Sequence, residues 1–203
     1  MKNSNLFIKR LIDLFGSLVG LIIISPILIV LAISIKLTSK GPIFFNQERL
    51  GRNGKVFKII KFRTMVVNAE RIGDGLTLKS ENDDRITKIG RILRATSFDE
   101  LPQLFNVLAG QMSLVGPRPP VVYFPYDGFE NYPKWAKKRF RMSPGMTGLT
   151  QVTVRNSVSW DDRIIVDNEY IDAFNVWLDI RILFKTVYKL FKSENVYMKT
   201  EKK

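Results

Sequence analysis

Histidine and cysteine are both absent from the 203 residues of this chain. Nucleophilic catalysis by a Ser/His or Cys/His pair and a Cys/His zinc site are therefore excluded or badly handicapped, and no disulfide can form. The side chains left for catalysis are carboxylates, lysine, arginine, tyrosine, serine and threonine. Carboxylates bind a hard cation through oxygen or attack phosphorus directly, so phosphate chemistry loses nothing through these absences.

Acidic residues are few: 19 Asp and Glu stand against 32 Lys and Arg, which gives a formal net charge of +13. This excess predicts an anionic partner, and nucleic acid, an anionic membrane surface and a phosphorylated substrate are all candidates. The length and the 45% hydrophobic content are enough for one domain with appendages.

Charge is missing altogether from Leu14 to Ile35, about the ~20 residues that a helix needs to cross a hydrocarbon core. We expect this segment to enter a membrane and to stay attached, since the apolar run is too long for a signal peptide and no small-residue cleavage pattern follows it. Ser25-Pro26 interrupts its middle, where the proline removes one backbone donor and favours a kink.

Basic residues flank the apolar segment on both sides, which makes both ends look cytoplasmic. A helix that enters, breaks at Ser25-Pro26 and returns satisfies both ends, whereas an ordinary span places one basic end outside. On these residues alone both topologies stay open. The flanking cations are Lys2, Lys9, Arg10, Lys36, Lys40, Arg49 and Arg52.

Two adjacent carboxylates, Asp99 and Glu100, precede a short amphipathic helix that we expect to begin near Pro102. A capping box formed by Ser97 and Glu100 is the alternative, but it would place the proline inside the helix instead of at its first position. The proline also disfavours the α conformation at Leu101, which predicts a bend with both carboxylates near the positive helix end. The apolar positions expected to pack on a core are Leu101, Leu104, Phe105 and Leu108.

A β-hairpin is predicted around Asn53-Gly54, because this pair lies between the apolar runs Ile43–Phe45 and Val56–Ile60. In Lys61–Met65 cations alternate with apolar groups, a pattern equally typical of the solvated face of a strand. The polar, glycine-containing residues 66–84 predict a loop or a short helix.

A cationic amphipathic helix is predicted from Arg85 to Ala95, and it would bring Arg94 close to Asp99. Further along, residues 160–192 predict two helices that are separated near Asn175.

Aromatic and basic residues cluster at Tyr123–Tyr126 and at Trp135–Arg141. Such clusters suit a membrane interface, with rings at headgroup depth and cations against anionic lipid, and an ordinary surface helix with one buried aromatic ring is the alternative. The tight loop Pro144–Leu149 follows and runs into side chains that can hydrogen-bond a ligand, namely Gln151, Arg155 and Asn156.

Taken in order, these motifs resemble the small monotopic phosphoglycosyl transferases, the bacterial sugar transferase family that starts surface-glycan assembly. The resemblance covers nearly the whole chain. It depends on Ser25-Pro26, Lys61–Met65, Asp83–Thr87, Arg94–Gly110, Met112–Pro119 and Pro144–Asn156.

The resemblance implies an α+β fold that is mostly helical. Residues 1–40 would form a re-entrant membrane helix hairpin broken at Ser25-Pro26. Residues 41–203 would form a membrane-associated catalytic domain with a β-hairpin and amphipathic interfacial helices around a small core. The family location is the cytoplasmic face of the bacterial inner membrane, with monotopic attachment.

The implied reaction transfers a sugar 1-phosphate from a UDP-sugar to undecaprenyl phosphate and releases UMP. By the resemblance, Asp99 is the nucleophile that forms a covalent phospho-sugar intermediate, and Glu100 is the ligand of a Mg²⁺ that bridges the diphosphate. Arg118, held between two prolines, is expected to bind phosphate oxygens. Arg94 and Lys61 are further phosphate-binding candidates.

Nucleotide contacts are expected from Thr147, Gln151, Arg155 and Asn156. The chain departs from the family pattern at Ser143, where an arginine commonly precedes Pro-Gly; Arg139 and Arg141 are the nearby cations that could replace it. A glycine that usually precedes the Arg-Asn pair is also missing, since Val154 occupies that position.

Two other classes of protein compete with an enzyme. A membrane-anchored nucleic-acid-binding protein would account for the positive charge and the interleaved aromatic residues, but it leaves Asp99-Glu100 unexplained. An inactive scaffold for glycan-assembly enzymes would tolerate loss of the Asp99 carboxylate. The resemblance favours the enzyme, with membrane lipids and downstream glycosyltransferases as its other partners and no nucleic acid.

Overall fold

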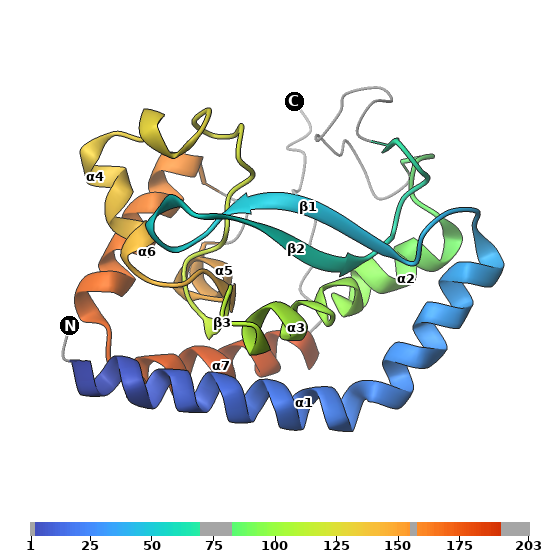
Figure 1. The fold of residues 1–203 in the computed structure, drawn as a ribbon, viewed down its shortest axis with the longest axis horizontal. Helices are drawn as coiled ribbons and strands as arrows, with labels where there is room; N and C mark the ends of the chain where they lie inside the picture. The colour runs from blue at the N-terminus through green and yellow to red at the C-terminus, as the bar shows by residue number, and fades with distance from the viewer. Residues whose placement is uncertain (1–2, 70–82, 155–157, 192–203) are drawn as a thin grey trace.

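The computed structural model describes residues 3–69, 83–154 and 158–191, and these are mostly helical with two small sheets (Figure 1). The predicted α+β, mostly helical class is confirmed. The helices are α1 (Asn3–Thr38), α2 (Lys88–Thr96), α3 (Gln103–Leu108), α4 (Lys134–Lys137), α5 (Leu149–Thr153), α6 (Trp160–Ala173) and α7 (Val176–Phe191). The strands are β1 (Phe44–Leu50), β2 (Val56–Phe62), β3 (Ser113–Val115) and β4 (Gly145–Thr147). Short 3₁₀ turns are η1 (Arg52–Gly54), η3 (Phe98–Glu100), η4 (Phe129–Asn131) and η5 (Lys138–Arg141).

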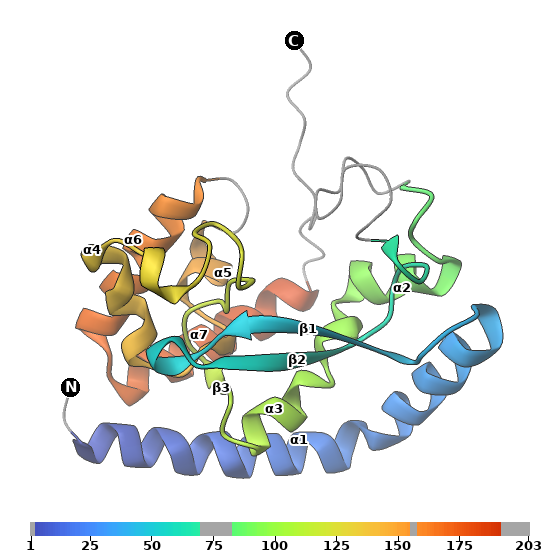
Figure 2. The ribbon, with the colours of Figure 1, turned by 45° about the horizontal axis from the view of Figure 1, so that its top comes forward.

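Helix α1 runs along one side of the molecule, and α3 and α7 lie against it (Figures 1 and 2). In the described part of the chain it alone is long and apolar enough to cross a membrane, and only 11% of its most apolar stretch is buried in the protein. A core helix of a soluble protein would be largely covered. The exposed apolar surface therefore favours the predicted membrane segment.

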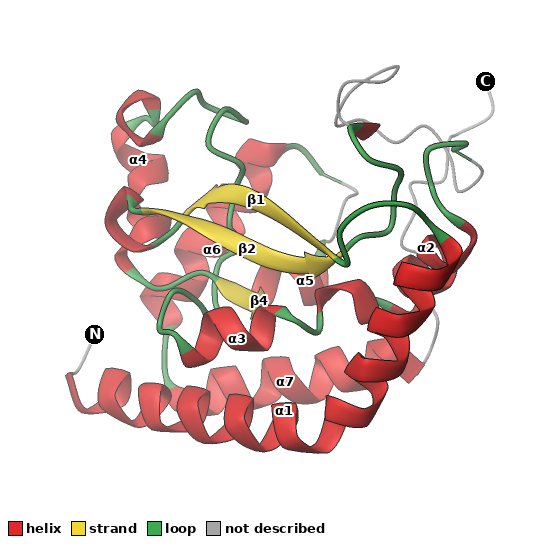
Figure 3. Cartoon of the chain, turned by 45° about the vertical axis from the view of Figure 1, so that its right-hand side comes forward, coloured by secondary structure: helices red, strands yellow, loops and turns green. Residues whose placement is uncertain are grey.

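The helix continues without interruption through Pro26, so the helical break predicted at this point is not present. The physical reason is a substitute hydrogen bond: the Ser25 hydroxyl donates to the carbonyl of Ile22 at 2.8 Å, and this is the carbonyl that the missing N–H of Pro26 would have bonded. The helix bends instead, and its second part turns towards α2 (Figure 3). Re-entry into one membrane face stays a prediction.

Buried charges attach the first part of α1 to the rest of the protein. Lys9 Nζ lies 2.6 Å from Asp179 of α7 and donates to the carbonyl of Val115 at 2.7 Å. Asp13 Oδ1 accepts two hydrogen bonds from β3, both at 2.9 Å. Asp179 also accepts a hydrogen bond from a buried tyrosine hydroxyl at 2.7 Å. We call this set the α1 anchor; its side chains are Lys9, Asp13, Ser113, Tyr170 and Asp179.

The other end of α1 is held by Arg63, which follows β2. Its guanidinium donates to the carbonyl of Ser39 at 3.0 Å and also to the carbonyl of Lys40. These carbonyls stand at the negative end of the helix, where a cation is stabilising. Arg63 is thus occupied in binding the helix end.

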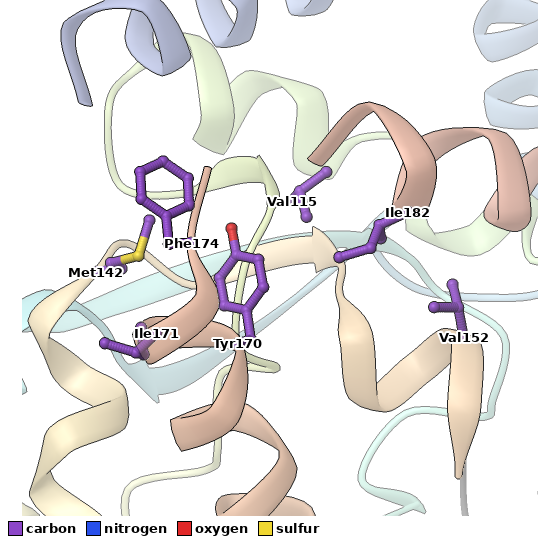
Figure 4. Packing of buried hydrophobic residues seen from close by; sticks show 7 residues of the cluster. All are labelled: Val115, Met142, Val152, Tyr170, Ile171, Phe174 and Ile182. Atoms are coloured by element: carbon purple, nitrogen blue, oxygen red, sulfur yellow. The ribbon is translucent and has the colours of Figure 1, made fainter. Parts of the chain in front are cut away.

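Strands β1 and β2 form the predicted antiparallel hairpin, paired from Phe44↔Phe62 to Leu50↔Val56. Its turn places Asn53 at φ 55° and Gly54 at φ 76°, the left-handed region that an Asn-Gly pair adopts at little cost. A second, parallel pair joins β3 to β4. Behind it, Figure 4 shows the buried cluster that connects β3, α5, α6 and α7. Its members are Val115, Met142, Val152, Tyr170, Ile171, Phe174 and Ile182.

Three other predictions concern helices. The separation of α6 and α7 near Asn175 is confirmed. Helix α2 begins at Lys88, later than expected, because the Thr87 side chain caps it by accepting from the N–H of Gly90 and because buried Arg85 pairs with Asp83 at 2.7 Å. In α3 two of the apolar positions expected in the core, Phe105 and Leu108, are exposed.

The aromatic and basic run Trp135–Arg141 contributes to the core. Its sequence predicts either a membrane interface or an ordinary surface helix with one buried aromatic ring. Phe140 is buried, and its ring packs edge-on against Tyr132 with centroids 4.9 Å apart. Arg139 is buried as well, whereas Trp135 is exposed. This segment therefore packs mainly inward.

Candidate active site

Asp99 and Glu100 lie on η3, the short turn between α2 and α3. Ser97 adopts φ 59° and its side chain makes no capping hydrogen bond, so the capping-box alternative is wrong. Helix α3 begins after Pro102, as predicted. Leu101, however, has φ −55° and ψ −37°, and its expected extended conformation is wrong. Local hydrogen bonds from its N–H and to its carbonyl, at 3.3 and 3.1 Å, outweigh the bias that the proline imposes.

Three cations that the sequence singled out converge on this turn. Lys61, near the end of β2, places Nζ 2.6 Å from Glu100 Oε1. Arg118 Nη2 lies 3.7 Å from the same oxygen. Arg94, in the last turn of α2, is close enough for its charge to lower the pKa of Asp99. The structure therefore brings Asp99, Glu100, Lys61, Arg94 and Arg118 together, although they come from separate elements.

A buried asparagine fixes the turn against the hairpin. Asn106 of α3 accepts from the N–H of Ile60 at 2.9 Å and donates to the carbonyl of Lys58 at 2.8 Å. These two bonds tie α3 to the residues just before Lys61. The sequence analysis missed this role, and the only signal for it is a polar side chain among the apolar positions of a short helix.

The two carboxylates have opposite electrostatic surroundings. Burial raises the pKa of Asp99 to about 6, and the neighbouring charge of Glu100 adds to this, against the attraction of Lys61 and Arg94. Burial also disfavours the ionised form of Glu100, but the nearby positive charges of Lys61 and Arg118, together with Arg49, lower its pKa to about 2. At neutral pH Glu100 is an anion, and Asp99 is mainly ionised while poorly solvated. Poor solvation suits a nucleophile, and a persistent charge suits a metal ligand.

Arg118 sits on a proline-rich loop whose backbone is fixed from several sides. Four successive carbonyls of this loop accept hydrogen bonds from distant parts of the chain, at 2.6 to 3.0 Å. Gly116 is required because an added Cβ would lie 2.5 Å from the carbonyl oxygen of Ser143. The acceptor and donor residues are Pro117 and Gly145, Arg118 and Arg139, Pro119 and Arg49, and Pro120 and Leu50.

Of the two cations offered as replacements for the family arginine at Ser143, Arg139 is buried and Arg141 is exposed. Arg139 contacts the backbone of Arg118 and pairs with Asp167 at 2.7 Å. Asp167 and Arg49 are site-supporting residues that the sequence analysis did not identify. Their partners lie 28 and 70 positions away, beyond the range of any local pattern.

Two of the four predicted nucleotide-binding residues, Thr147 and Gln151, lie in the described part of the chain. The Thr147 hydroxyl shares a hydrogen bond of 2.7 Å with Thr186 of α7. Gln151 lies on α5, and its buried amide nitrogen and oxygen have no hydrogen-bond partner within the ranges that the structure describes. Arg155 and Asn156 lie outside the described residues.

Among the described residues no group of three or more Asp, Glu, His or Cys side chains could hold a metal ion. A Mg²⁺ that takes its remaining ligands from phosphate oxygens and water requires only one or two protein carboxylates. Glu100, with a pKa held at about 2, and adjacent Asp99 supply that donor set. The residues present therefore fit a Mg²⁺ that binds together with a diphosphate.

Residues 4–193 match the family described as "Bacterial sugar transferase". The chain is 44% identical over 196 residues to "Galactosyl transferase CpsE" of Streptococcus agalactiae, covering 92% of this chain and 42% of that protein. It is 43% identical over 202 residues to "UDP-glucose:undecaprenyl-phosphate glucose-1-phosphate transferase" of Klebsiella pneumoniae, covering 97% and 43%. "Exopolysaccharide production protein ExoY" of Rhizobium meliloti is 36% identical, with 93% and 88% covered.

The chain thus spans less than half the length of the first two relatives and most of the third.

Proposed function

The chain belongs to the bacterial sugar transferase family, and we propose that it transfers a sugar 1-phosphate from a UDP-sugar to undecaprenyl phosphate, with release of UMP. The observation that carries this proposal is the pair Asp99-Glu100 with Lys61, Arg94 and Arg118 around it. Phosphoryl transfer needs alignment and charge neutralisation more than a strong general base. The name of the Klebsiella relative, which specifies this type of transfer, supports the same substrates.

In the first half-reaction a carboxylate oxygen of Asp99 attacks the β-phosphorus of the UDP-sugar. The bond from that phosphorus to the oxygen bridging the two phosphates breaks, and UMP leaves with the electron pair. The product is a sugar phosphate whose phosphorus is joined to the Asp99 carboxyl group as a mixed anhydride. The poorly solvated carboxylate of Asp99, mainly ionised at neutral pH, supports its assignment as the nucleophile.

In the second half-reaction a phosphate oxygen of undecaprenyl phosphate attacks the same phosphorus. The bond to Asp99 breaks, and the free carboxylate and an undecaprenyl diphosphate sugar are formed. Dividing the transfer in this way lets a water-soluble donor and a lipid acceptor use one site in turn.

The cations hold the phosphate oxygens during both steps. Arg118, whose side chain is 42% exposed, can form a forked pair with an incoming phosphate. Lys61 on β2 and Arg94 on α2 add further positive charge around the two carboxylates. Glu100, with Asp99 beside it, would hold the Mg²⁺, which when bound neutralises charge on the diphosphate.

Exposed apolar side chains support a place at the membrane for this site. They project from α1, α3 and α7, which lie together along one side of the molecule in Figures 1 and 2. On this basis we place these helices in the interfacial and hydrocarbon region of the inner membrane, at its cytoplasmic face, with α1 re-entrant. The exposed residues on α3 and α7 include Phe105, Leu108, Trp177, Phe184, Val187 and Tyr188.

Topology can be tested cleanly because the chain contains no cysteine. Single cysteines introduced at Asn5 and at Lys40 should both react with a membrane-impermeant reagent added from the cytoplasmic side of inverted vesicles. Reaction of one position from each side would contradict re-entry and favour an ordinary span.

The reaction itself is tested by UMP release from a panel of UDP-sugars, with the protein held in nanodiscs together with Mg²⁺ and undecaprenyl phosphate. We expect release with at least one sugar, and loss of release in Asp99→Asn and in Glu100→Gln. Wild-type turnover by Asp99→Asn would contradict the covalent mechanism. Absence of release with every sugar would favour the scaffold or the nucleic-acid-binding alternative, and the latter would show salt-sensitive binding without turnover.

A further inference from the structure

In the described part of the chain, the one carboxylate within ion-pair distance of the Arg118 side chain is Glu100. It is 3.7 Å away and is already paired with Lys61 at 2.6 Å. An exposed arginine held only by a distant charge samples many rotamers. The direction in which Arg118 leaves its loop must therefore be set by the backbone from which it projects.

That backbone is held directly at Arg118 by one charged group. Arg139 of η5 is 1% exposed, and its Nη2 donates to the carbonyl of Arg118 at 2.6 Å. The same nitrogen lies 2.7 Å from Asp167 of α6, and Asp167 in turn accepts from the Thr150 hydroxyl at 2.5 Å. The loop is thus connected through one guanidinium to two helices of the core.

This arrangement is poorly suited to stabilisation alone. Two further nitrogens of Arg139, Nε and Nη1, are buried with no hydrogen-bond partner in the described part of the chain. A buried ion pair contributes little net stability because desolvation offsets the attraction, and unsatisfied donors add to that cost. The clearest consequence of the pair is geometric, since it fixes the position of one carbonyl.

We propose that Arg139 is a positioning residue which, backed by Asp167, holds the carbonyl of Arg118 so that the Arg118 side chain is presented to the phosphates of the donor. The proposal rests on the proposed function for its catalytic consequence. Because Arg139 is 1% exposed, its effect would be exerted through Arg118 and not by contact with the substrate.

The test removes both charges at once, so that no unpaired buried charge remains: Arg139→Met with Asp167→Asn. We expect kcat/KM for the UDP-sugar to fall by roughly 10- to 100-fold, as is typical when the partner that orients a site ligand is lost. A matched control is available in the exposed ion pair Lys138–Asp172, which joins the same two elements without touching Arg118. The control Lys138→Met with Asp172→Asn should change kcat/KM by less than about twofold.

A double-mutant cycle separates positioning from general damage. In an Arg118→Ala background the Arg139→Met/Asp167→Asn change should have almost no further effect on kcat/KM, because the side chain that it positions is gone. An equal loss of kcat/KM with and without Arg118 would overturn the proposal. Wild-type kcat/KM in Arg139→Met/Asp167→Asn would overturn it too, and so would an equal loss in the control Lys138→Met/Asp172→Asn. If the double variant fails to fold, Arg139→Lys retains the charge and one donor nitrogen, and its smaller loss should also vanish without Arg118.

A second readout does not depend on turnover. Amide hydrogen exchange of the peptide containing Gly116 and Arg118 should accelerate in Arg139→Met/Asp167→Asn, while exchange in β1 stays as in the wild type. Unchanged exchange at the loop would overturn the proposal even if the protein is active. If the wild type releases no UMP from any sugar, the proposed function fails, and this exchange measurement still decides the positioning role.

Discussion

Two lysine–carboxylate pairs in this protein have the same length and different surroundings. Lys9–Asp179 and Lys61–Glu100 both measure 2.6 Å. The side chains of the first pair are 8% and 9% exposed, and those of the second are 15% and 27% exposed. The distance between two charges therefore does not tell whether a pair anchors the fold or belongs to a reactive site.

The partners around each pair make the difference. Lys9 also donates to the carbonyl of Val115, and Asp179 accepts from Tyr170, so the α1 anchor is satisfied internally. Glu100 lies among more positive charge than it can neutralise, since Arg118 and Arg49 act on it in addition to Lys61. A satisfied pair attaches α1 to the core, whereas a pair with excess positive charge and access to solvent can accept a phosphate.

The largest effect is expected from removing the proposed nucleophile, Asp99, which lies beside the Lys61–Glu100 pair. Asp99→Asn should lower UMP release by about 10³-fold or more, because an amide cannot form the phosphoanhydride. The same chemical change in the Lys9–Asp179 pair, Asp179→Asn, should leave turnover per folded molecule within about twofold of the wild type. Steady-state UMP release from both variants in nanodiscs checks this, and similar losses in the two would remove the distinction between the pairs.

Breaking the Lys9–Asp179 pair should mainly reduce stability. Lys9→Met leaves Asp179 buried without its cation, and we expect a loss of about 3–5 kcal/mol in the free energy of unfolding. Lys9→Met with Asp179→Asn should recover most of that loss, since no buried charge is then unpaired. Thermal unfolding in detergent measures both variants. Equal destabilisation of the single and double variants would show that the charge pair is not the cause.

Breaking the Lys61–Glu100 pair should mainly reduce activity. Lys61→Met should lower kcat/KM by roughly 10- to 100-fold, or about 1.4–2.7 kcal/mol, because the charge that we propose to bind phosphate is lost. Its unfolding temperature should stay close to that of the wild type, since the Glu100 side chain is only partly buried, at 27% exposed, and keeps Arg118 nearby. A large fall in unfolding temperature with unchanged kcat/KM would assign Lys61 to the structural class instead.

The smallest effect concerns an uncharged contact in α1. Ser25→Ala removes the donor to the carbonyl of Ile22, and we expect a loss of about 1 kcal/mol in stability. Distances between spin labels on the two parts of α1 should broaden, because the bend at Pro26 then has one fewer constraint. Unchanged stability and unchanged distances would show that lipid or water replaces the hydroxyl.

Local patterns were sufficient for several parts of the structure. The Asn53-Gly54 turn and the start of α3 after Pro102 depend on backbone preferences of neighbouring residues, whereas the turn at Asp99-Glu100 forms without the extended Leu101 from which it was predicted. Arg94 was located through its place on a helix that leads into the same turn. Short-range rules thus predicted the hairpin turn, the start of α3 and the approach of Arg94 to Asp99.

Contacts across long sequence separations could not be predicted in the same way. No local signal indicates that Lys9 pairs with Asp179 or that Arg139 holds Arg118, since each pairing is produced by the tertiary fold. The exposure of Phe105 was missed for a related reason. Helical periodicity identifies an apolar face, but the same face suits a protein core and a lipid surface.

In the mechanism that we propose, Asp99 becomes covalently attached to the phospho-sugar. The decisive experiment incubates the protein with its UDP-sugar and Mg²⁺ in the absence of undecaprenyl phosphate, followed by intact-mass and peptide mass spectrometry. We expect a mass increase equal to one sugar phosphate on the peptide that contains Asp99. This increase should be absent in Asp99→Asn and lost when the acceptor is added. An active enzyme that shows no adduct, or an adduct that persists in Asp99→Asn, would contradict it.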